Sequence, residues 1–500
     1  MPDRRTFLAG AAAAMAAGLA RAQDRPKTNL LFLITDQHHA DWLGCAGHPL
    51  VKTPNLDRLA AGGTRFTGAY APVPYCSPTR LALMTGRYPS SLGLGRNVDA
   101  KADPLRLREP TQTYAGLLAQ QGYRCHQNGK WHLGDPTELN CYPTPDAEAI
   151  KTLVRNRRRA AGQGAYDDGP RPGEKTLVGD VWLRDQVADA HDLWLKEDKR
   201  PAQDVGVIGR LRIKPEFTEE AAITDHCCEL LRQHRNEPFA VTWSVSPPHA
   251  PWVAPSPYYD QYDPAAFTLP ATWRQSPQPW SASAAARMGR LYGEAGLREY
   301  LRCYAAQITM MDAFVGRLLD TLDELKLAER TLVVFTSDHG NLLGQHGMMD
   351  KTLGTFYEDL VRVPLLMRLP GAIPASAQRG GQVSLVDMAP TLLDYLGAPA
   401  LTTAHGRSLR GVLSGDDAGE ETIFAERNEP HLPSAARMVR TRDWKLCLLG
   451  RGQGELYDLK RDPGEATNLF TDPAHAATVA DLRGRLAKHA AAVGDPAHVA

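Results

Sequence analysis

Cys76 begins the five-residue motif Cys-Ser-Pro-Thr-Arg, which places a nucleophile and a cation one helical turn apart. The residues after the motif predict a helix through Met84, and a thiol at a helix N-terminus has a lowered pKa because it meets the positive end of the helix dipole. Arg80 would lie on the same helix face and could pair with an anion there. The motif therefore predicts a nucleophilic cysteine beside an anion site. On local sequence alone, the alternative is a buried structural cysteine.

Polar side chains also follow three apolar segments that we expect to be strands. Residues 29–34, 239–245 and 331–335 are apolar-rich runs, and such continuous runs are typical of strands buried on both faces of a sheet. In an open α/β sheet, ligands bind at the carboxyl ends of the strands. If the three strands belong to one sheet, the residues that follow them converge at one edge. These residues are Asp36, Gln37, His249, Asp338 and His339.

This set of side chains has the composition of a metal site. Among these five side chains, two carboxylates, an amide oxygen and an imidazole suit a hard divalent cation such as Ca²⁺, or alternatively Mg²⁺ or Mn²⁺. The alternative is that Asp36 and Asp338 cap helices that begin directly after the strands. The neighbouring cysteine motif favours the metal site.

The order of the remaining elements predicts an α/β fold. A helical pattern over residues 301–327 precedes the strand at 331–335, and this alternation is typical of a mostly parallel sheet flanked by helices. Residues 363–368 predict one more strand, and residues 385–396 predict a helix that ends at Gly397. We therefore expect a large central sheet with helices on its faces.

The chain changes character after about residue 410. Short segments there predict an antiparallel meander followed by a final helix, at residues 436–441, 444–449, 455–458 and 479–492. We accordingly predict a catalytic α/β domain over residues 23–410. A C-terminal subdomain, consisting of a small antiparallel sheet and a helix, would occupy residues 411–500.

Residues 1–22 resemble an export signal. Arg4 and Arg5 stand directly before an apolar run that is too short to span a bilayer, and Ala20-Arg21-Ala22 supplies a small-residue cleavage site. Paired arginines at this position indicate the Tat route. We expect cleavage near Ala22 and a periplasmic protein. No second apolar stretch predicts a membrane span.

Composition excludes several classes of protein. The 500 residues contain 57 Lys and Arg against 57 Asp and Glu, and this neutrality argues against a nucleic-acid binder. The eight cysteines include no Cys-x-x-Cys pair, which argues against a zinc ribbon or a thioredoxin-like site. The sequence carries no signal for an oligomeric state.

Five ordered motifs resemble those of the type I sulfatases, whose signature Cys-x-Pro-x-Arg contains a cysteine that is oxidised to formylglycine after synthesis. The resemblance extends from about Asn29 to Leu469. Cys125 and Asn128 depart mildly from the family's second signature. The matching motifs are Cys76–Arg80 with Thr85–Pro89, Gly122-Tyr123 with Gly129–His132, Asp338–Gly340, Asp350-Lys351, and Leu456–Leu459 with Asp462-Pro463 and Asn468-Leu469.

The resemblance implies an alkaline-phosphatase-like fold and a set of metal ligands. By position these ligands are Asp36, Gln37, Asp338 and His339, with the modified Cys76 as a further one. Many relatives carry Asp where Gln37 stands and Asn where His339 stands. The Gln/His pairing instead resembles the choline-sulfatase and phosphonate monoester hydrolase branch.

The resemblance also implies a mechanism. Hydrated formylglycine offers two hydroxyls, and the metal acidifies one of them to give the nucleophile. Arg80 and Lys130 would hold the diol and the sulfate oxygens, where charge develops. His132 would take the proton from the second hydroxyl, which expels sulfate and regenerates the aldehyde. His249 and Lys351 would contact the sulfate and protonate the departing oxygen.

The sequence thus predicts a sulfuric ester hydrolase acting on a sulfated glycan or a small sulfate ester. Its Cys76 would be converted by a formylglycine-generating enzyme before export. A phosphonate monoester or phosphodiester hydrolase with the same modified residue is the alternative among enzymes. A binder of sulfated ligands that keeps Cys76 as a thiol is the alternative outside enzymes, and the complete set of cations and histidines argues against it.

Overall fold

A seven-stranded sheet forms the centre of the computed structural model. The structure describes residues 27–98, 105–134, 139, 147–160, 174–176, 181–198, 206–276, 284–352, 355–428, 435–450 and 452–495. The strand order is β11-β2-β10-β9-β1-β7-β3, and β10 alone among them runs antiparallel to its neighbours. The strands are β1 (Asn29–Thr35), β2 (Thr64–Tyr70), β3 (Arg124–Gly129), β7 (Phe239–Ser244), β9 (Thr331–Ser337), β10 (Arg362–Arg368) and β11 (Ala377–Ser384). The prediction of a mostly parallel α/β sheet is confirmed.

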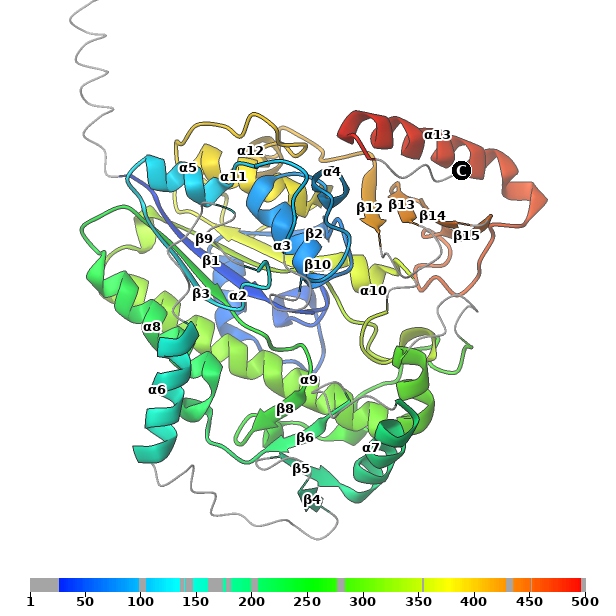
Figure 1. Cartoon of the computed structure of the whole chain (residues 1–500), viewed down its shortest axis with the longest axis horizontal. Coiled ribbons are helices and arrows are strands. Elements are labelled where there is room, and N and C mark those ends of the chain that lie inside the picture. Colours follow the sequence, from blue (N-terminus) through cyan, green and yellow to red (C-terminus); the bar gives the residue numbers. More distant parts are fainter. Residues whose placement is uncertain are drawn as a thin grey trace, which may run out of the picture.

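Helices cover both faces of this sheet (Figure 1). One face packs against α3 (Cys76–Thr85), α5 (Tyr114–Gln120) and α11 (Met388–Tyr395), and the other against α2 (Pro54–Ala61), α8 (Glu219–Gln233) and α9 (Ala284–Glu324). The position of β1 between two hydrophobic cores explains why its sequence is apolar. Phe32 packs into the first core and Leu33 into the second, because successive side chains of a strand point to opposite faces.

A second, smaller sheet lies beyond α9, at the bottom of Figure 1. It has the order β4-β5-β6-β8 and packs with α7 against α9. The bounds are β4 (Glu174–Thr176), β5 (Val181–Arg184), α7 (Asp185–Asp198), β6 (Ile208–Leu211) and β8 (Trp252–Pro255), and α6 (Ala147–Ala160) packs on α8. The sequence did not predict these elements.

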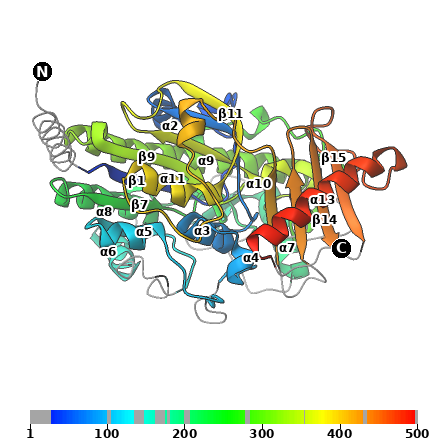
Figure 2. The same cartoon turned by 90° about the horizontal axis from the view of Figure 1, so that it is seen from above.

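The C-terminal part of the chain forms an antiparallel sheet with one long helix across it (Figure 2). Its strands are β12 (Ile423–Arg427), β13 (Ala436–Arg440), β14 (Trp444–Gly450) and β15 (Gln453–Asp458), and its helix is α13 (Ala476–Val493). Leu482 and Leu486 of α13 pack against the apolar face of this sheet. The meander and final helix match the prediction in kind, and β12 is an additional strand. The predicted domain boundary at residue 410 stays a prediction. The chain also forms the short helices α4 (Pro89–Leu92), α10 (Glu358–Val361) and α12 (Arg410–Ser414).

Two expectations about helices need correction. The helix expected over 301–327 is part of α9, which begins at Ala284 and ends at Glu324. Gly293 (φ 60°, ψ −165°) interrupts α9 and divides it into two helical segments. Asp36 and Asp338 cap no helix, since turns and loops follow β1 and β9. The capping alternative for these two carboxylates is therefore wrong.

Some predictions fall outside the described residues. The export signal over residues 1–22 and Cys141 are among them. Within the described ranges, the seven remaining cysteines are unpaired thiols. In the same ranges we find no helix with the length and apolar character needed to cross a membrane.

Candidate active site

The register of the central sheet brings the predicted polar residues together. Thr35 of β1 pairs with Ser337 of β9, so Asp36 and Asp338 leave neighbouring strands at the same level. On the other side of β1, Ile34 pairs with Ser244 of β7, and Ser244 in turn pairs with Gly129 of β3. The segments carrying Asp36 and Asp338 therefore begin at one edge of the sheet, as the sequence predicted. The segment carrying Lys130 begins at the same edge, after a strand that the sequence did not predict.

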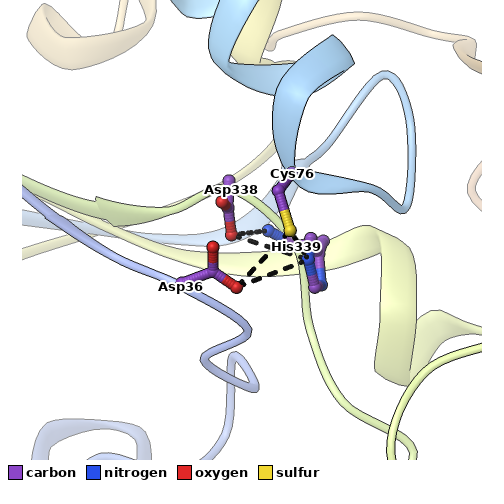
Figure 3. A group of neighbouring side chains, drawn as sticks. All are labelled: Asp36, Cys76, Asp338 and His339. Atoms are coloured by element: carbon purple, nitrogen blue, oxygen red, sulfur yellow. Dashed lines mark hydrogen bonds and ion pairs between the residues drawn. The ribbon is translucent and has the colours of Figure 1, made fainter. Parts of the chain in front are cut away.

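Cys76 is the first residue of α3, and its sulfur lies among these strand ends (Figure 3). The sulfur is 3.2 Å from His339 Nε2 and 3.6 Å from Asp36 Oδ1. Donor atoms of Asp36, Cys76, Asp338 and His339 all lie within 4.8 Å of one another, and all four side chains are fully buried. This is the group that could hold a cation.

In both Asp36 and Asp338, the two carboxylate oxygens have different partners. Oδ2 of each carboxylate is bound by cations. Arg80 Nε donates to Asp338 Oδ2 at 2.8 Å. Asp36 Oδ2 contacts Arg80 Nη2 at 3.3 Å and Lys130 Nζ at 2.6 Å. Oδ1 of each lies on the side of His339, whose Nε2 is 3.7 Å from Asp36 and 3.8 Å from Asp338. One oxygen of each carboxylate is thus directed at the common centre.

His339 is prepared to act as a ligand through Nε2. Its Nδ1 lies 2.9 Å from the carbonyl of Gly340, and a carbonyl accepts only, so Nδ1 carries the proton. In the neutral ring, this leaves the lone pair on Nε2, which faces Cys76 and the carboxylates. A backbone contact of this kind is the usual way in which the tautomer of a metal-binding histidine is fixed.

Lys351 joins Gln37 to the same group. Lys351 Nζ donates to Gln37 Oε1 at 3.1 Å and to Cys76 Sγ at 3.5 Å, and it is 3.5 Å from His339 Nε2. Gln37 has a left-handed backbone conformation (φ 66°), and its main-chain N–H donates to Asp338 Oδ1 at 3.1 Å. The predicted ligand Gln37 therefore lies beside the predicted cation Lys351.

Arg80 is fully enclosed by protein groups. Besides the two carboxylates, its guanidinium donates to the carbonyl of Lys130 at 2.9 Å and to Ser244 Oγ at 2.8 Å. These contacts fix the positions of Asp36 and Asp338 relative to each other. Arg80 therefore neutralises the carboxylates, a contact that the sequence did not indicate.

The remaining predicted residues lie on the more accessible side of the group. Lys130, His132, His249 and Lys351 are all partly exposed, in contrast to the buried donors. His132 is tied to the residue after Cys76, because Ser77 Oγ donates to its carbonyl at 2.6 Å, and its buried Nδ1 has no hydrogen-bond partner in the described part of the chain. His249 Nδ1 donates to the carbonyl of Ala250 at 2.8 Å, which leaves Nε2 unprotonated in the neutral ring.

The carboxyl groups of Asp36 and Asp338 differ in pKa. Burial raises the pKa of Asp36, but Lys130, His249 and Lys351 together hold that pKa well below its usual range. Burial and the charge of Asp36 raise the pKa of Asp338 to about 6, despite Arg80. Two buried carboxylates this close disfavour full ionisation of both. A divalent cation would relieve that repulsion, so the residues present fit a metal ion.

The same cations act on the sulfur. Burial and Asp36 each raise the pKa of the Cys76 thiol, but Lys351, Lys130 and His339 outweigh them and hold it well below the usual range. Burial and the charge of Lys351 together lower the pKa of His249 to about 4. The position of Cys76 therefore stabilises a negative charge.

Sequence reasoning missed three contributors to the site. Ser244, the last residue of β7, binds Arg80, and its position at a strand end was the available signal. Tyr304 donates to the carbonyl of Gln37 at 2.6 Å from the interior of α9. Asp350 accepts a hydrogen bond from Gln37 Nε2 at 2.5 Å, a contact that the Asp350-Lys351 motif did not indicate. No local sequence pattern marked Tyr304.

The mostly parallel sheet and the buried Asp/Cys/Asp/His group at its edge agree with the alkaline-phosphatase-like class of hydrolases that the sequence resemblance implies. Residues 28–398 match the sulfatase family model, and residues 344–492 match the model described as N-sulphoglucosamine sulphohydrolase, C-terminal. The chain belongs to the sulfatase family. The predictions of this family and of a sulfuric ester hydrolase are confirmed.

Individual relatives agree with this assignment. The N-acetylglucosamine-6-O-sulfatase of Bacteroides thetaiotaomicron is 26% identical, over 90% of this chain and 83% of that protein. The choline-sulfatase of Rhizobium meliloti is 28% identical, over 93% and 87% respectively. The solved structure of a phosphonate monoester hydrolase of Agrobacterium radiobacter shares the fold with a TM-score of 0.75 at 23% identity, over 93% of this chain and 96% of that one.

Proposed function

We propose that this sulfatase hydrolyses sulfate monoesters of a saccharide, using formylglycine made from Cys76. The observation that carries the proposal is the position of the Cys76 side chain. It lies at the start of α3, within 3.6 Å of Asp36 Oδ1, His339 Nε2 and Lys351 Nζ. The name of the Bacteroides relative, a sulfatase of N-acetylglucosamine, supports a sulfated sugar as substrate.

The proposal includes one divalent cation, for which Ca²⁺ is our first candidate and Mg²⁺ or Mn²⁺ the others. Asp36, Gln37, Asp338 and His339 would hold it, since oxygen-rich donor sets of this kind suit hard cations. When bound, such an ion acidifies a neighbouring hydroxyl and offsets the charge of a sulfate group. Arg80 and Lys130 keep the oxygens of Asp36 and Asp338 in place for it.

The other residues would handle the substrate and its protons. Lys130 and Lys351 place positive charge on the partly exposed side of the group, where the sulfate oxygens would lie. His132 would accept the proton whose loss expels sulfate and restores the aldehyde. His249 and Lys351 would contact the ester and return a proton to the departing oxygen.

A mass measurement tests the formylglycine. When the protein is co-expressed with a formylglycine-generating enzyme, the peptide containing residue 76 should be about 18 Da lighter than the unmodified one, because CHO replaces CH₂SH at the nucleophile. Cys76→Ser should be severely impaired, since a serine ester of sulfate has no second hydroxyl to drive its release. Cys125→Ser, which changes a buried thiol of β3, is the matched control and should stay active. Fully active enzyme with unmodified Cys76 would contradict the proposal.

A phosphonate monoester or phosphodiester hydrolase is the second candidate. The combination of glutamine at position 37 with histidine at position 339 and the structural likeness to the Agrobacterium enzyme favour it. Rates should be compared side by side on sulfated glycans, an aryl sulfate, a phenylphosphonate ester and a phosphodiester. A higher kcat/KM on the sulfate esters supports our first proposal, and a higher value on the phosphonate supports the second.

We also propose that the protein reaches the periplasm through the Tat pathway, after modification of Cys76 and with cleavage near Ala22. The paired Arg4 and Arg5 support this route. Replacement of both by lysine should leave the precursor in the cytoplasm, as measured by cell fractionation. Export of that variant at the wild-type rate would contradict the proposal.

A further inference from the structure

The side-chain amide of Gln37 lies between two groups of opposite charge. On one side, Gln37 Nε2 donates to Asp350 Oδ1 at 2.5 Å. On the other side, Lys351 Nζ donates to Gln37 Oε1 at 3.1 Å. Consecutive residues of one loop therefore contact the two ends of the same amide.

This arrangement permits only one orientation of the amide. A carboxylate can only accept hydrogen bonds, and an ammonium can only donate them. Turning the amide by 180° would place Oε1 against the Asp350 carboxylate and the NH₂ group against the Lys351 ammonium. The observed orientation is therefore set by chemistry, and it directs Oε1 toward Lys351, whose Nζ also contacts Cys76 Sγ and His339 Nε2.

The main chains of both residues are also held in place. Tyr304 Oη donates to the carbonyl of Gln37 at 2.6 Å, and the Gln37 N–H donates to Asp338 Oδ1 at 3.1 Å. The N–H of Asp350 donates to Tyr300 Oη at 3.3 Å. Gln37 and Asp350 both have positive φ, 66° and 74°, which non-glycine residues adopt only when their surroundings impose it. The remaining freedom of the Gln37 amide is rotation about its side-chain bonds.

We propose that Asp350 is a positioning residue that keeps Gln37 Oε1 directed toward the metal-binding group. The inference rests on the proposed function, in which Gln37 is a metal ligand. An amide presents one oxygen that can bind a metal and one nitrogen that cannot, so its orientation decides whether it can act as a ligand. A carboxylate at position 37 would have two equivalent oxygens and would need no such partner. The contact with Asp350 therefore matters for the orientation of a glutamine at position 37, whereas a carboxylate there does not depend on it.

Calcium binding to metal-free protein tests this inference without measuring activity. The Ca²⁺ affinity is measured by titration calorimetry on the full chain, with the modification state of residue 76 matched by mass spectrometry. Four proteins form a cycle: wild type, Asp350→Asn, Gln37→Asp and the double variant. We expect Asp350→Asn to weaken Ca²⁺ binding by about 10- to 100-fold, the usual effect of removing a group that orients a ligand.

The double variant separates orientation from charge. Loss of the Asp350 carboxylate near the ion weakens Ca²⁺ binding both in the wild type and in Gln37→Asp. Loss of the orienting contact weakens Ca²⁺ binding only when residue 37 is glutamine. We therefore expect Asp350→Asn to cost at least about tenfold more affinity in the wild-type background than in the Gln37→Asp background. Asp350→Gly is a second variant, and both Asn and Gly tolerate the left-handed backbone at this position, so folding is retained. Asp41→Asn, in the same segment as Gln37 but paired with Arg362, should bind Ca²⁺ like the wild type.

The outcomes distinguish this inference from the proposed function. Equal losses of affinity in the wild-type and Gln37→Asp backgrounds overturn the positioning role of Asp350 while leaving the metal site intact. Wild-type affinity in both Asp350→Asn and Asp350→Gly does the same. A wild-type protein that binds neither Ca²⁺, Mg²⁺ nor Mn²⁺ overturns the metal site itself, and the role of Asp350 with it.

Discussion

Lys445 of the C-terminal sheet donates a hydrogen bond to the carbonyl of Phe356 at 2.8 Å. Its ammonium, which is completely buried, also contacts Glu358 Oε1 at 3.2 Å and forms an ion pair with Glu465. Phe356 and Glu358 belong to the segment between Lys351 and β10. The C-terminal sheet is therefore attached by a buried charge to the part of the chain that carries an active-site cation.

Replacing Lys445 by methionine should destabilise the whole protein. The substitution keeps most of the side-chain volume but leaves Glu358 and Glu465 buried without their shared cation. We expect the free energy of unfolding to fall by about 3–5 kcal/mol, the usual effect of removing one partner of a buried ion pair. Urea denaturation measures this change. Lys460→Met, at an exposed position, should change stability by less than about 0.5 kcal/mol, and a similarly small change in Lys445→Met would refute the prediction.

Asp338→Asn should remove metal binding and activity together. The amide keeps a hydrogen-bond acceptor for Arg80 but takes away the negative charge that a divalent cation needs, at a fully buried position. We expect a loss of about 1000-fold or more in kcat/KM, because a bound ion contributes several kcal/mol to transition-state stabilisation. Metal content by elemental analysis and rates on one sulfate ester check both effects. Asp320→Asn, which changes an exposed partner of Arg58, is the control. Full metal content in Asp338→Asn would remove Asp338 from the ligand set.

Strands β1, β7, β9 and β10 of the central sheet could be predicted from the sequence because they are rich in apolar residues and buried on both faces. Strands β2, β3 and β11 contain polar residues that are not fully buried, and the sequence did not predict them. Runs such as Asn29–Ile34 identify buried strands, and the polar residues after them identify the edge of the sheet that carries the site. The small sheet over residues 174–255 could not be predicted in this way. Its strands have only three or four residues, which is too short for a period of two to be distinguished from chance.

The parts of the site could be predicted more easily than their contacts. The types and spacing of Cys76, Arg80 and Asp338 indicated their presence in one site. The role of Asp350 depends on left-handed backbone at two separate positions and on Tyr300 and Tyr304, which lie far away in the sequence. Such contacts are set by tertiary packing and leave no local pattern.

Gly129→Ala should disturb the site through a backbone contact. Gly129 ends β3 just before Lys130, and a Cβ at this position would lie 1.9 Å from the carbonyl oxygen of Ser244. The sheet would have to open beside the residue that binds Arg80. We expect a loss of about 3 kcal/mol or more in stability together with reduced activity, both from the clash and from the positive φ of 86°.

Gly122→Ala is the matched control for this substitution. Gly122 precedes the same strand and has a similar φ of 81°, but a Cβ there would meet no atom within 4 Å. This variant should lose only the roughly 1–2 kcal/mol that left-handed backbone costs an L-residue. Equal unfolding midpoints for the two variants would show that the contact with Ser244 is unimportant.

Glu426 should make the stability of the protein depend on pH. This β12 residue is buried, and it accepts hydrogen bonds from both the N–H and the hydroxyl of Ser90 at 2.5 Å. Burial raises the pKa of its carboxyl to about 7, although Arg437 acts in the opposite direction. Because the folded protein holds this proton more tightly than the unfolded chain, the contribution is complete below the unfolded pKa of about 4.3 and is lost as pH rises through 7. Between pH 5 and pH 8 the wild type should lose on the order of 2 kcal/mol from this group.

Glu426→Gln isolates this effect, because glutamine has no proton to lose in this range. Its Oε1 can accept from the Ser90 N–H, and its Nε2 can donate to the Ser90 hydroxyl, so the contacts are retained. We therefore expect the variant to gain stability relative to the wild type as pH rises from 5 to 8, as measured by urea denaturation at each pH. Glu329→Gln, at an exposed position, should follow the wild-type curve. The main-chain N–H of Glu426 donates to the carbonyl of Pro72 at 2.8 Å, which joins β12 to the segment that leads into Cys76. Parallel stability curves for Glu426→Gln and the wild type would show that Glu426 is already ionised in the folded protein at pH 5.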